Sequence, residues 1–247
     1  MRANPICENK KMVSDSEKRK TTCCKTEKED RMIPIHAYID HTNLKPFATE
    51  QDIEKLCREA AKYQFASVCI NPCHVALARR LLDGTGVKVC TVIGFPLGAN
   101  TTAVKVFETE DAFRNGCDEF DMVINIGAMK EGHYDYVQNE IAAVVAAAKG
   151  RCVKVIIETG LLTDEEKIMA TRLACAAGVT FVKTSTGVNS TGATVADVKL
   201  MKSNVSGGVQ VKAAGGIKTA EQALALIEAG ADRIGASSGV AIVEELK

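Results

Sequence analysis

The chain has 247 residues, 46% of them hydrophobic, and its 31 Lys and Arg residues balance its 31 Asp and Glu residues. This length suits one globular domain near the upper size for a single hydrophobic core. The balanced charge gives no indication of nucleic-acid binding, and no apolar run approaches the roughly 18 residues that cross a bilayer. We therefore expect a soluble protein with neither nucleic acid nor membrane as a partner.

Residues 1–30 carry eight Lys and Arg and six Asp and Glu, without hydrophobic periodicity. Such a segment cannot bury enough apolar surface to offset the entropy of ordering, so we predict a disordered polar extension. Its mixed charge is unlike a transit peptide, and it lacks the apolar centre of a signal peptide. The folded domain is predicted to span residues 31–247.

Eight short apolar runs follow, and they are typical of parallel strands covered by helices: 37–40, 66–70, 87–93, 118–125, 152–158, 179–183, 209–213 and 232–235. Amphipathic stretches between the runs predict helices over Glu50–Gln64, Tyr134–Lys149, Asp164–Ala177, Thr194–Lys202 and Thr219–Ala229. Eight alternating units favour an α/β fold of the closed (β/α)₈ barrel type. An open doubly wound sheet is the structural alternative.

The ten cysteines are many for a chain of this length. Most lie inside apolar runs, where a reduced thiol packs as a small hydrophobic group: Cys69, Cys90, Cys117, Cys152 and Cys175. This distribution favours a reducing, cytoplasmic location. The nearest approach to a metal-ligand pattern is Cys69, Cys73 and His74, but the intervening Asn71-Pro72 indicates a strand that ends in a turn. We therefore predict no metal site.

Two lysines, Lys183 and Lys212, each end a β-branched run just before a turn rich in small residues. The carboxyl ends of the strands carry the chemistry of (β/α)₈ barrels. A lysine amine has an ordinary pKa of about 10.4, so an attacking lysine needs a dry pocket or a neighbouring charge, and a second lysine is such a neighbour. The simpler interpretation, that both lysines reach solvent from strand ends, stays open at this point.

Asp121 lies between apolar neighbours in a predicted strand. A carboxylate inside a barrel is costly unless a cation pairs with it, and either lysine could do so. An amine nucleophile, a second ammonium group and a carboxylate that relays protons together support Schiff-base chemistry without a cofactor. A metal-dependent enzyme would need several His or carboxylate ligands, which these strand ends lack.

Turns of small residues follow the last strands, where barrels commonly bind phosphate. The predicted phosphate-binding residues are Thr186, Gly187, Gly215, Gly216, Lys218, Gly235, Ser237 and Ser238. The alternative is that these glycines serve only the geometry of tight turns.

Eight segments together resemble the deoxyribose-phosphate aldolase family, and the resemblance runs from about Ile35 to Lys247: Ile39–Thr42, Ser67–Pro72, Val92–Gly98, Asp118–Asn125, Lys154–Thr159, Phe181–Gly187, Val211–Ile217 and Arg233–Ser238. The family consists of class I aldolases on a (β/α)₈ barrel. The resemblance implies reversible cleavage of 2-deoxy-D-ribose 5-phosphate, a small sugar phosphate, to D-glyceraldehyde 3-phosphate and acetaldehyde, with no external cofactor. It also implies self-association into dimers or higher oligomers.

By the same resemblance, Lys183 forms the imine, while Asp121 and Lys212 manage the proton transfers. Asp40 and Thr42 match positions near the substrate and the second lysine. Cys69 matches a pocket-lining cysteine, although a packed thiol without a role is the alternative. Val188 stands where some members carry a lysine, so Lys218 becomes the candidate cation at the phosphate.

Two other functions stay open on the sequence. One is a Schiff-base barrel lyase that acts on a different sugar phosphate. The other is a catalytically silent barrel that binds a phosphate ligand. The presence of Lys183, Lys212 and Asp121 argues against the silent barrel, because each would cost stability if buried without use.

Overall fold

The computed structural model describes residue 1 and residues 34–247. Residues 35–247 form one compact unit. The predicted polar extension, Met1 apart, lies outside the described residues.

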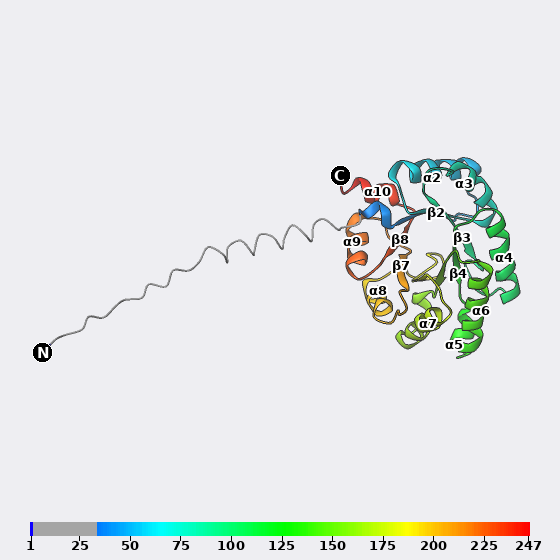
Figure 1. Ribbon diagram of the computed structural model, residues 1–247, viewed down its shortest axis with the longest axis vertical. Helices are drawn as coiled ribbons and strands as arrows, with labels where there is room; N and C mark the ends of the chain where they lie inside the picture. The colour runs from blue at the N-terminus through cyan, green and yellow to red at the C-terminus, as the bar shows by residue number, and fades with distance from the viewer. Residues whose placement is uncertain (2–33) are drawn as a thin grey trace. The chain divides into compact units, whose positions relative to one another are not determined.

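Eight parallel strands close into a barrel in sequence order (Figure 1). Their bounds are β1 (Ile39–Asn43), β2 (Ser67–Ile70), β3 (Lys88–Ile93), β4 (Glu119–Val123), β5 (Cys152–Ile156), β6 (Phe181–Lys183), β7 (Gln210–Ala214) and β8 (Arg233–Ala236). The register of β1 against β8 pairs Ile39 with Ile234 and closes the sheet. The predicted (β/α)₈ barrel is confirmed, and the open sheet is wrong because the two terminal strands are hydrogen-bonded to each other.

The helices surround the barrel (Figure 1). Their bounds are α2 (Glu50–Tyr63), α3 (Val75–Leu81), α4 (Thr102–Arg114), α5 (Ile126–Lys130), α6 (Tyr134–Ala147), α7 (Asp164–Ala176), α8 (Val195–Lys202), α9 (Ala220–Glu228) and α10 (Gly239–Glu244). The five predicted helices agree with α2, α6, α7, α8 and α9 to within two residues at each end. One difference lies at the start, where a 3-10 helix over Ile35–Tyr38 replaces the first residues of the predicted first strand.

Threonine residues begin several of these helices by accepting a backbone hydrogen bond from the first turn. Thr49, Thr163 and Thr219 each form a reciprocal capping box with the residue three positions later. Such caps satisfy donors that the first turn of a helix leaves unpaired. They set where α2, α7 and α9 start and so fix the length of the turns that precede them.

The two faces of each strand serve different purposes. Phe120 and Met122 of β4, and Val153 and Val155 of β5, belong to the apolar layer between barrel and helices. The intervening residues, Asp121 and Lys154 among them, are buried and charged. Since neighbouring residues of a strand point to opposite faces, the charged set lies inside the barrel.

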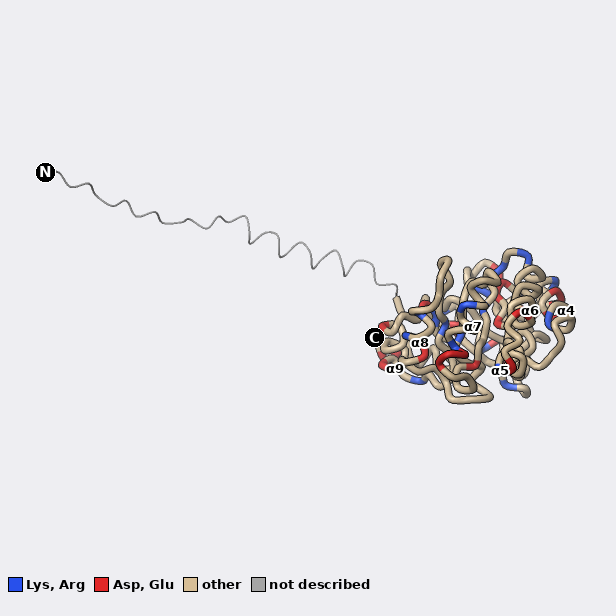
Figure 2. The backbone as a smooth tube through the Cα atoms, turned by 90° about the horizontal axis from the view of Figure 1, so that it is seen from below, with Lys and Arg blue, Asp and Glu red and all other residues tan. Residues whose placement is uncertain are grey.

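Within the described part of the chain, no helix is both long enough and apolar enough to span a membrane. Lys and Arg are interspersed with Asp and Glu around the barrel unit (Figure 2).

Candidate active site

The barrel interior brings three lysines to one carboxylate. Strand register pairs Asp121 with Lys154 across β4 and β5, and Lys183 with Lys212 across β6 and β7. Asp121 Oδ2 accepts hydrogen bonds from Lys183 Nζ at 2.8 Å and from Lys212 Nζ at 2.7 Å. Asp121 Oδ1 accepts one from Lys154 Nζ at 2.9 Å. The structure therefore brings together the three residues that the sequence predicted to act jointly, and it adds a fourth.

Two further carboxylates and an arginine extend this cluster below Asp121. Asp40 Oδ2 lies 2.5 Å from Lys212 Nζ, and Asp40 Oδ1 accepts a hydrogen bond from Arg233 Nη1 at 2.7 Å. Glu119 Oε2 lies 2.5 Å from Lys154 Nζ. We call this set the barrel cluster: Asp40, Glu119, Asp121, Lys154, Lys183, Lys212 and Arg233. With every member ionised, its four cations exceed its three anions by one positive charge.

For the two central carboxylates of the barrel cluster, the effect of the neighbouring cations on the pKa is larger than the effect of burial. Burial would raise the pKa of Asp121, but the ammonium groups of Lys154, Lys183 and Lys212 hold that pKa well below its usual range. The pKa of Asp40 is likewise lowered, because Lys212, Lys154 and Arg233 overcome the effect of burial.

The two fully buried lysines of the barrel cluster respond in the opposite direction. Burial alone would lower their pKa, yet Asp121 and its neighbouring anions raise the pKa of Lys154 well above its usual range. Asp121 and Asp40 raise the pKa of Lys212 for the same reason. Lys212 and Lys154 are thus held as ammonium ions and Asp121 as a carboxylate.

Lys154, Glu119 and Arg233 were not among the residues that the sequence analysis singled out for the site. A signal for Lys154 exists in the sequence, since it is the one charged residue in the run Cys152-Val153-Lys154-Val155-Ile156. A charge at the centre of a strand that is otherwise apolar must face a partner inside the barrel. The partner itself could not be named without the register.

Cys69 lies beside this cluster rather than in the open cavity. Cys69 and Cys90 are register partners on β2 and β3, and both are buried. Cys90 Sγ donates to Asp121 Oδ1 at 3.2 Å. A hydrogen bond with Cys90 lowers the pKa of Cys69, whereas burial raises the pKa of Cys90 well above its usual range.

One group of side chains in the described part of the chain has metal-ligand spacing, and it consists of Cys69, Cys90 and Asp121. The three ammonium groups on Asp121 make this position unfavourable for a further cation. The sequence pattern considered above does not assemble, because Cys73 is exposed while Cys69 is buried.

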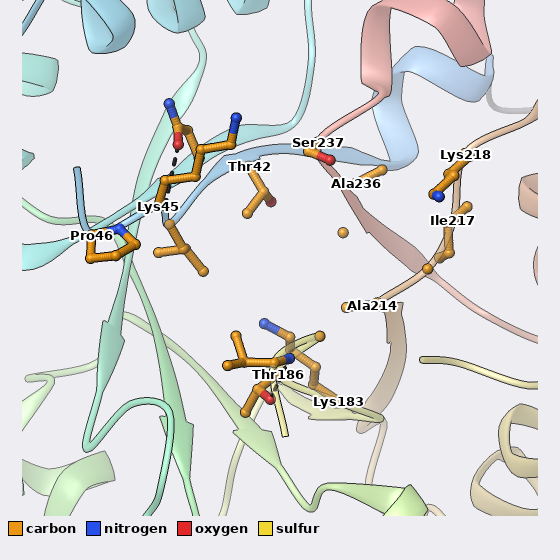
Figure 3. A pocket seen from close by; sticks show the side chains of 17 residues that line it. Thr42, Lys45, Pro46, Lys183, Thr186, Ala214, Ile217, Lys218, Ala236 and Ser237 are labelled. Carbon is orange, nitrogen blue, oxygen red and sulfur yellow. Dashed lines mark hydrogen bonds between the residues drawn. The ribbon is translucent and has the colours of Figure 1, made fainter. Parts of the chain in front are cut away.

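A cavity of about 400 Å³ opens above the barrel cluster at the carboxyl ends of the strands. Of the predicted site residues, those that line it are Thr42, Lys183, Thr186, Gly187, Gly215, Gly216, Lys218, Gly235 and Ser237. Figure 3 shows the Lys183 amine pointing into the open space that Thr42, Ala236 and Ile217 surround. Asp40, Asp121, Lys212, Cys69 and Ser238 are not among the lining residues. Lys183 is thus the member of the barrel cluster that reaches the cavity.

The glycine turns of the cavity rim approach one another closely. A Cβ at Gly187 would lie 3.4 Å from Gly215 Cα, and one at Gly235 would lie 3.1 Å from Lys212 Cε. Within residues 34–247, the backbone N–H groups of Gly187 and Gly216 donate to no other group of the protein. Free donors of this kind, near the exposed amine of Lys218, suit an anionic group.

A (β/α)₈ barrel with a lysine–carboxylate cluster beneath a cavity and glycine turns around its rim has the arrangement of a lysine-dependent lyase. Comparison with known proteins identifies the family. The family model described as DeoC/LacD family aldolase matches residues 35–245. The chain belongs to this family of aldolases.

Individual relatives agree with that assignment. The chain is 61% identical over 210 residues to a deoxyribose-phosphate aldolase from Enterococcus faecalis. The aligned region covers 85% of this chain and 96% of the relative. A putative deoxyribose-phosphate aldolase from Coccidioides immitis superimposes with a TM-score of 0.84 at 40% identity, over 95% of this chain and 99% of the other. The tetrameric deoxyribose phosphate aldolase from Aeropyrum pernix gives a TM-score of 0.81 at 36% identity, over 86% and 90%.

Proposed function

We propose that the chain reversibly cleaves 2-deoxy-D-ribose 5-phosphate to D-glyceraldehyde 3-phosphate and acetaldehyde through a Schiff base on Lys183. The observation that carries this proposal is the position of Lys183, whose Nζ contacts Asp121 at 2.8 Å while its side chain lines the cavity. The family membership and the relatives named above support the same reaction.

The charge of the barrel cluster suits an amine nucleophile. The cluster has one cation more than it has anions, so loss of one proton from an amine would make it neutral. Lys212 and Lys154 are fully buried and held as ammonium ions, whereas Lys183 is open to the cavity. Lys183 is therefore the amine of the barrel cluster that a carbonyl carbon in the cavity can reach.

In the cleavage direction the Lys183 amine attacks C1 of the open-chain sugar, and loss of water leaves the imine. The imine then accepts the electron pair of the C2–C3 bond as the C3 hydroxyl loses its proton. D-Glyceraldehyde 3-phosphate departs, and an enamine remains on Lys183. Protonation of the enamine carbon and hydrolysis of the resulting imine release acetaldehyde and regenerate the amine, so no external oxidant or cofactor is needed.

Lys212 and Asp121 are proposed to manage the proton transfers. Asp121 Oδ2 contacts both Lys183 Nζ and Lys212 Nζ, so it connects the nucleophile to a second ammonium group at distances of 2.8 Å and 2.7 Å. The low pKa of Asp121 keeps it ionised, which suits a carboxylate that orients both amines. The ammonium ion of Lys212 is then the proton donor of the pair.

The phosphate group is proposed to bind at the glycine rim. The free N–H groups of Gly187 and Gly216 and the amine of Lys218 would contact its oxygens, with Gly235 and Ser237 completing the rim. Ser238 follows directly in the chain and would act from behind this rim. Asp40 would hold Lys212, and Thr42 would contact the sugar.

Self-association is a further part of the proposal. The tetrameric relative from Aeropyrum pernix supports it. Size-exclusion chromatography with light scattering measures the assembly directly.

Borohydride trapping tests the proposed chemistry. The protein is treated with 2-deoxyribose 5-phosphate and sodium borohydride, and the adduct is located by peptide mass spectrometry. An adduct on Lys183 is expected, and Lys183→Ala protein treated identically should carry none. No adduct on folded protein would refute the aldolase proposal and favour a silent barrel that binds phosphate. An adduct formed only with another sugar phosphate would favour a lyase of different substrate.

A further inference from the structure

Glu158 is a buried charged residue that the proposed chemistry does not use. It follows β5, is 0% exposed, and has the left-handed backbone conformation with a φ of 55°. Residues other than glycine adopt this conformation at an energetic cost, which the surrounding structure must outweigh. Among the described residues, no Lys, Arg or His forms an ion pair with it. Its carboxylate must therefore be stabilised by hydrogen-bond donors alone.

Both donors come from one turn, the segment 186–190 after β6. Glu158 Oε2 accepts a hydrogen bond from the Thr186 backbone N–H at 3.2 Å, and Oε1 accepts one from Ser190 Oγ at 2.6 Å. The two contacts hold the first and last residues of this segment, which we call the rim turn. A Cβ at Gly160 would lie 2.7 Å from Ser190 Cβ, so the backbone after Glu158 also packs against the turn.

The rim turn has few other restraints. Thr186 Oγ1 accepts from the backbone N–H groups of Val188 at 3.1 Å and Asn189 at 3.3 Å. Asn189 Nδ2 donates to Pro96 O at 2.7 Å, which connects the turn to the segment after β3. The middle of the rim turn carries the free N–H of Gly187 and the cavity-lining Val188.

We infer that Glu158 is a positioning residue that holds the rim turn so that the Gly187 N–H faces the phosphate of the substrate. This inference rests on the proposed function. Glu158 contacts no member of the barrel cluster through its side chain, so it acts on recognition of the phosphate end and leaves the lysine chemistry unchanged. It therefore sets the preference of the enzyme for phosphorylated over unphosphorylated sugar.

Glu158→Gln is the decisive variant. Glutamine has the same size but offers one acceptor oxygen and one NH₂ group, so one of the two donors of the rim turn would face another donor. We expect KM for 2-deoxyribose 5-phosphate to rise about tenfold, since one charge-assisted hydrogen bond is lost. The kcat/KM for unphosphorylated 2-deoxyribose should stay within about twofold of wild type, because that sugar makes no use of the rim.

Two further variants and the trapping assay make the result interpretable. Glu165→Gln, an exposed glutamate of α7, is the matched control and should leave both substrates unaffected. Ser190→Ala removes the hydroxyl that donates to Glu158 Oε1 and to Thr191 O but leaves the Thr186 contact in place, so it should raise KM for the phosphorylated substrate by a smaller factor. This second variant decides the matter if Glu158→Gln fails to fold.

The outcomes separate this inference from the proposed function. Equal losses on both sugars, or no change in their ratio, would overturn the positioning role even while Lys183 is still trapped by borohydride. Absence of trapping on the wild-type protein would instead overturn the proposed function itself. A selective loss on the phosphorylated sugar, with trapping of Lys183 intact, is the result expected.

Discussion

Within residues 34–247, two regions bury lysines completely, and the surroundings of these lysines differ. In the barrel cluster, Lys154 and Lys212 meet Asp121 beneath a cavity that Lys183 lines. Between the barrel and its helices, Lys105 of α4 meets Glu140 of α6 at 2.8 Å, and both side chains are 0% exposed.

The Lys105–Glu140 pair has no net charge, and neither side chain is exposed to solvent. Lys105 Nζ also donates to Gly98 O at 2.8 Å and to Val123 O at 2.9 Å, so its three donors are all engaged. Burial lowers the pKa of Lys105 and raises that of Glu140, which means that their attraction does not fully offset desolvation. The pair joins the segment after β3 and the end of β4 to the surrounding helices.

Burial of a lysine is therefore not by itself a sign of chemistry. The barrel cluster has an excess positive charge and one amine open to a cavity, whereas the Lys105–Glu140 pair has neither. Four experiments test this contrast.

Replacement of the proposed nucleophile, Lys183, should abolish turnover without unfolding the protein. Lys183→Ala removes the one amine of the cluster that reaches the cavity, and we expect kcat to fall by at least about 10⁴-fold. The fold should survive because three cations then balance three anions. Steady-state kinetics and thermal melting measure both effects, with Lys55→Ala on the exposed face of α2 as control. Retained activity would refute the assignment of the imine to Lys183.

Loss of the second lysine should slow the reaction and move its pH profile. Lys212→Leu removes the ammonium group that contacts Asp121 and Asp40, and we expect kcat to fall by about 10²-fold or more. The excess charge that favours loss of a proton from the cluster disappears too, so the rising limb of kcat/KM should move to higher pH by about one unit. A profile that moves to lower pH would contradict this charge argument.

Disruption of the Lys105–Glu140 pair should lower stability but leave activity nearly unchanged. Lys105→Met leaves the buried carboxylate of Glu140 without its cation, and we expect a loss of about 3 kcal/mol in the free energy of unfolding. The kcat of the folded protein should stay within about twofold of wild type. Urea unfolding and kinetics measure the two quantities. Lys105→Met/Glu140→Leu should recover much of the lost stability, and a selective loss of kcat would show that the pair serves catalysis after all.

The pH dependence of stability should arise from the barrel cluster. Asp40 and Asp121 have lowered pKa values, so their contribution is complete above the ordinary value of 3.8 and is lost as the pH falls below it. Lys154 and Lys212 have raised pKa values, so their contribution is complete below the ordinary value of 10.5 and is lost as the pH rises above it.

We therefore expect Tm to be constant between these limits. Beyond either limit, the free energy of unfolding should fall by about 1.4 kcal/mol in total for each unit by which one pKa is displaced. Melting curves from acid to alkaline pH should show the same two limits in Lys105→Met/Glu140→Leu protein, because that variant leaves the barrel cluster intact. If the pH range of constant Tm differs in this variant, the pH dependence arises from the Lys105–Glu140 pair instead.

Most of the fold and part of the site could be predicted from local patterns. The apolar runs located all eight strands, and the amphipathic stretches located α2, α6, α7, α8 and α9. Lys183 and Lys212 attracted attention because each precedes a turn of small residues. Cys69 was harder to judge, since a thiol in an apolar run reads the same whether it lines a pocket or packs beside Cys90.

Local sequence patterns were enough to predict the order of strands and helices and to single out Lys183 and Lys212 as candidate site residues, because periodicity and turn residues act over short stretches of chain. Which side chains meet depends instead on how the strands and loops pack in three dimensions. The contact between Lys154 and Asp121 depends on strand register, and the contacts of Glu158 with Thr186 and Ser190 depend on how two loops pack. Barrel closure brings β8 to β1 and so places Arg233 on Asp40, 193 residues away in the chain. Charges buried in this way are stable only when their partners arrive together, and that condition is set by the whole barrel.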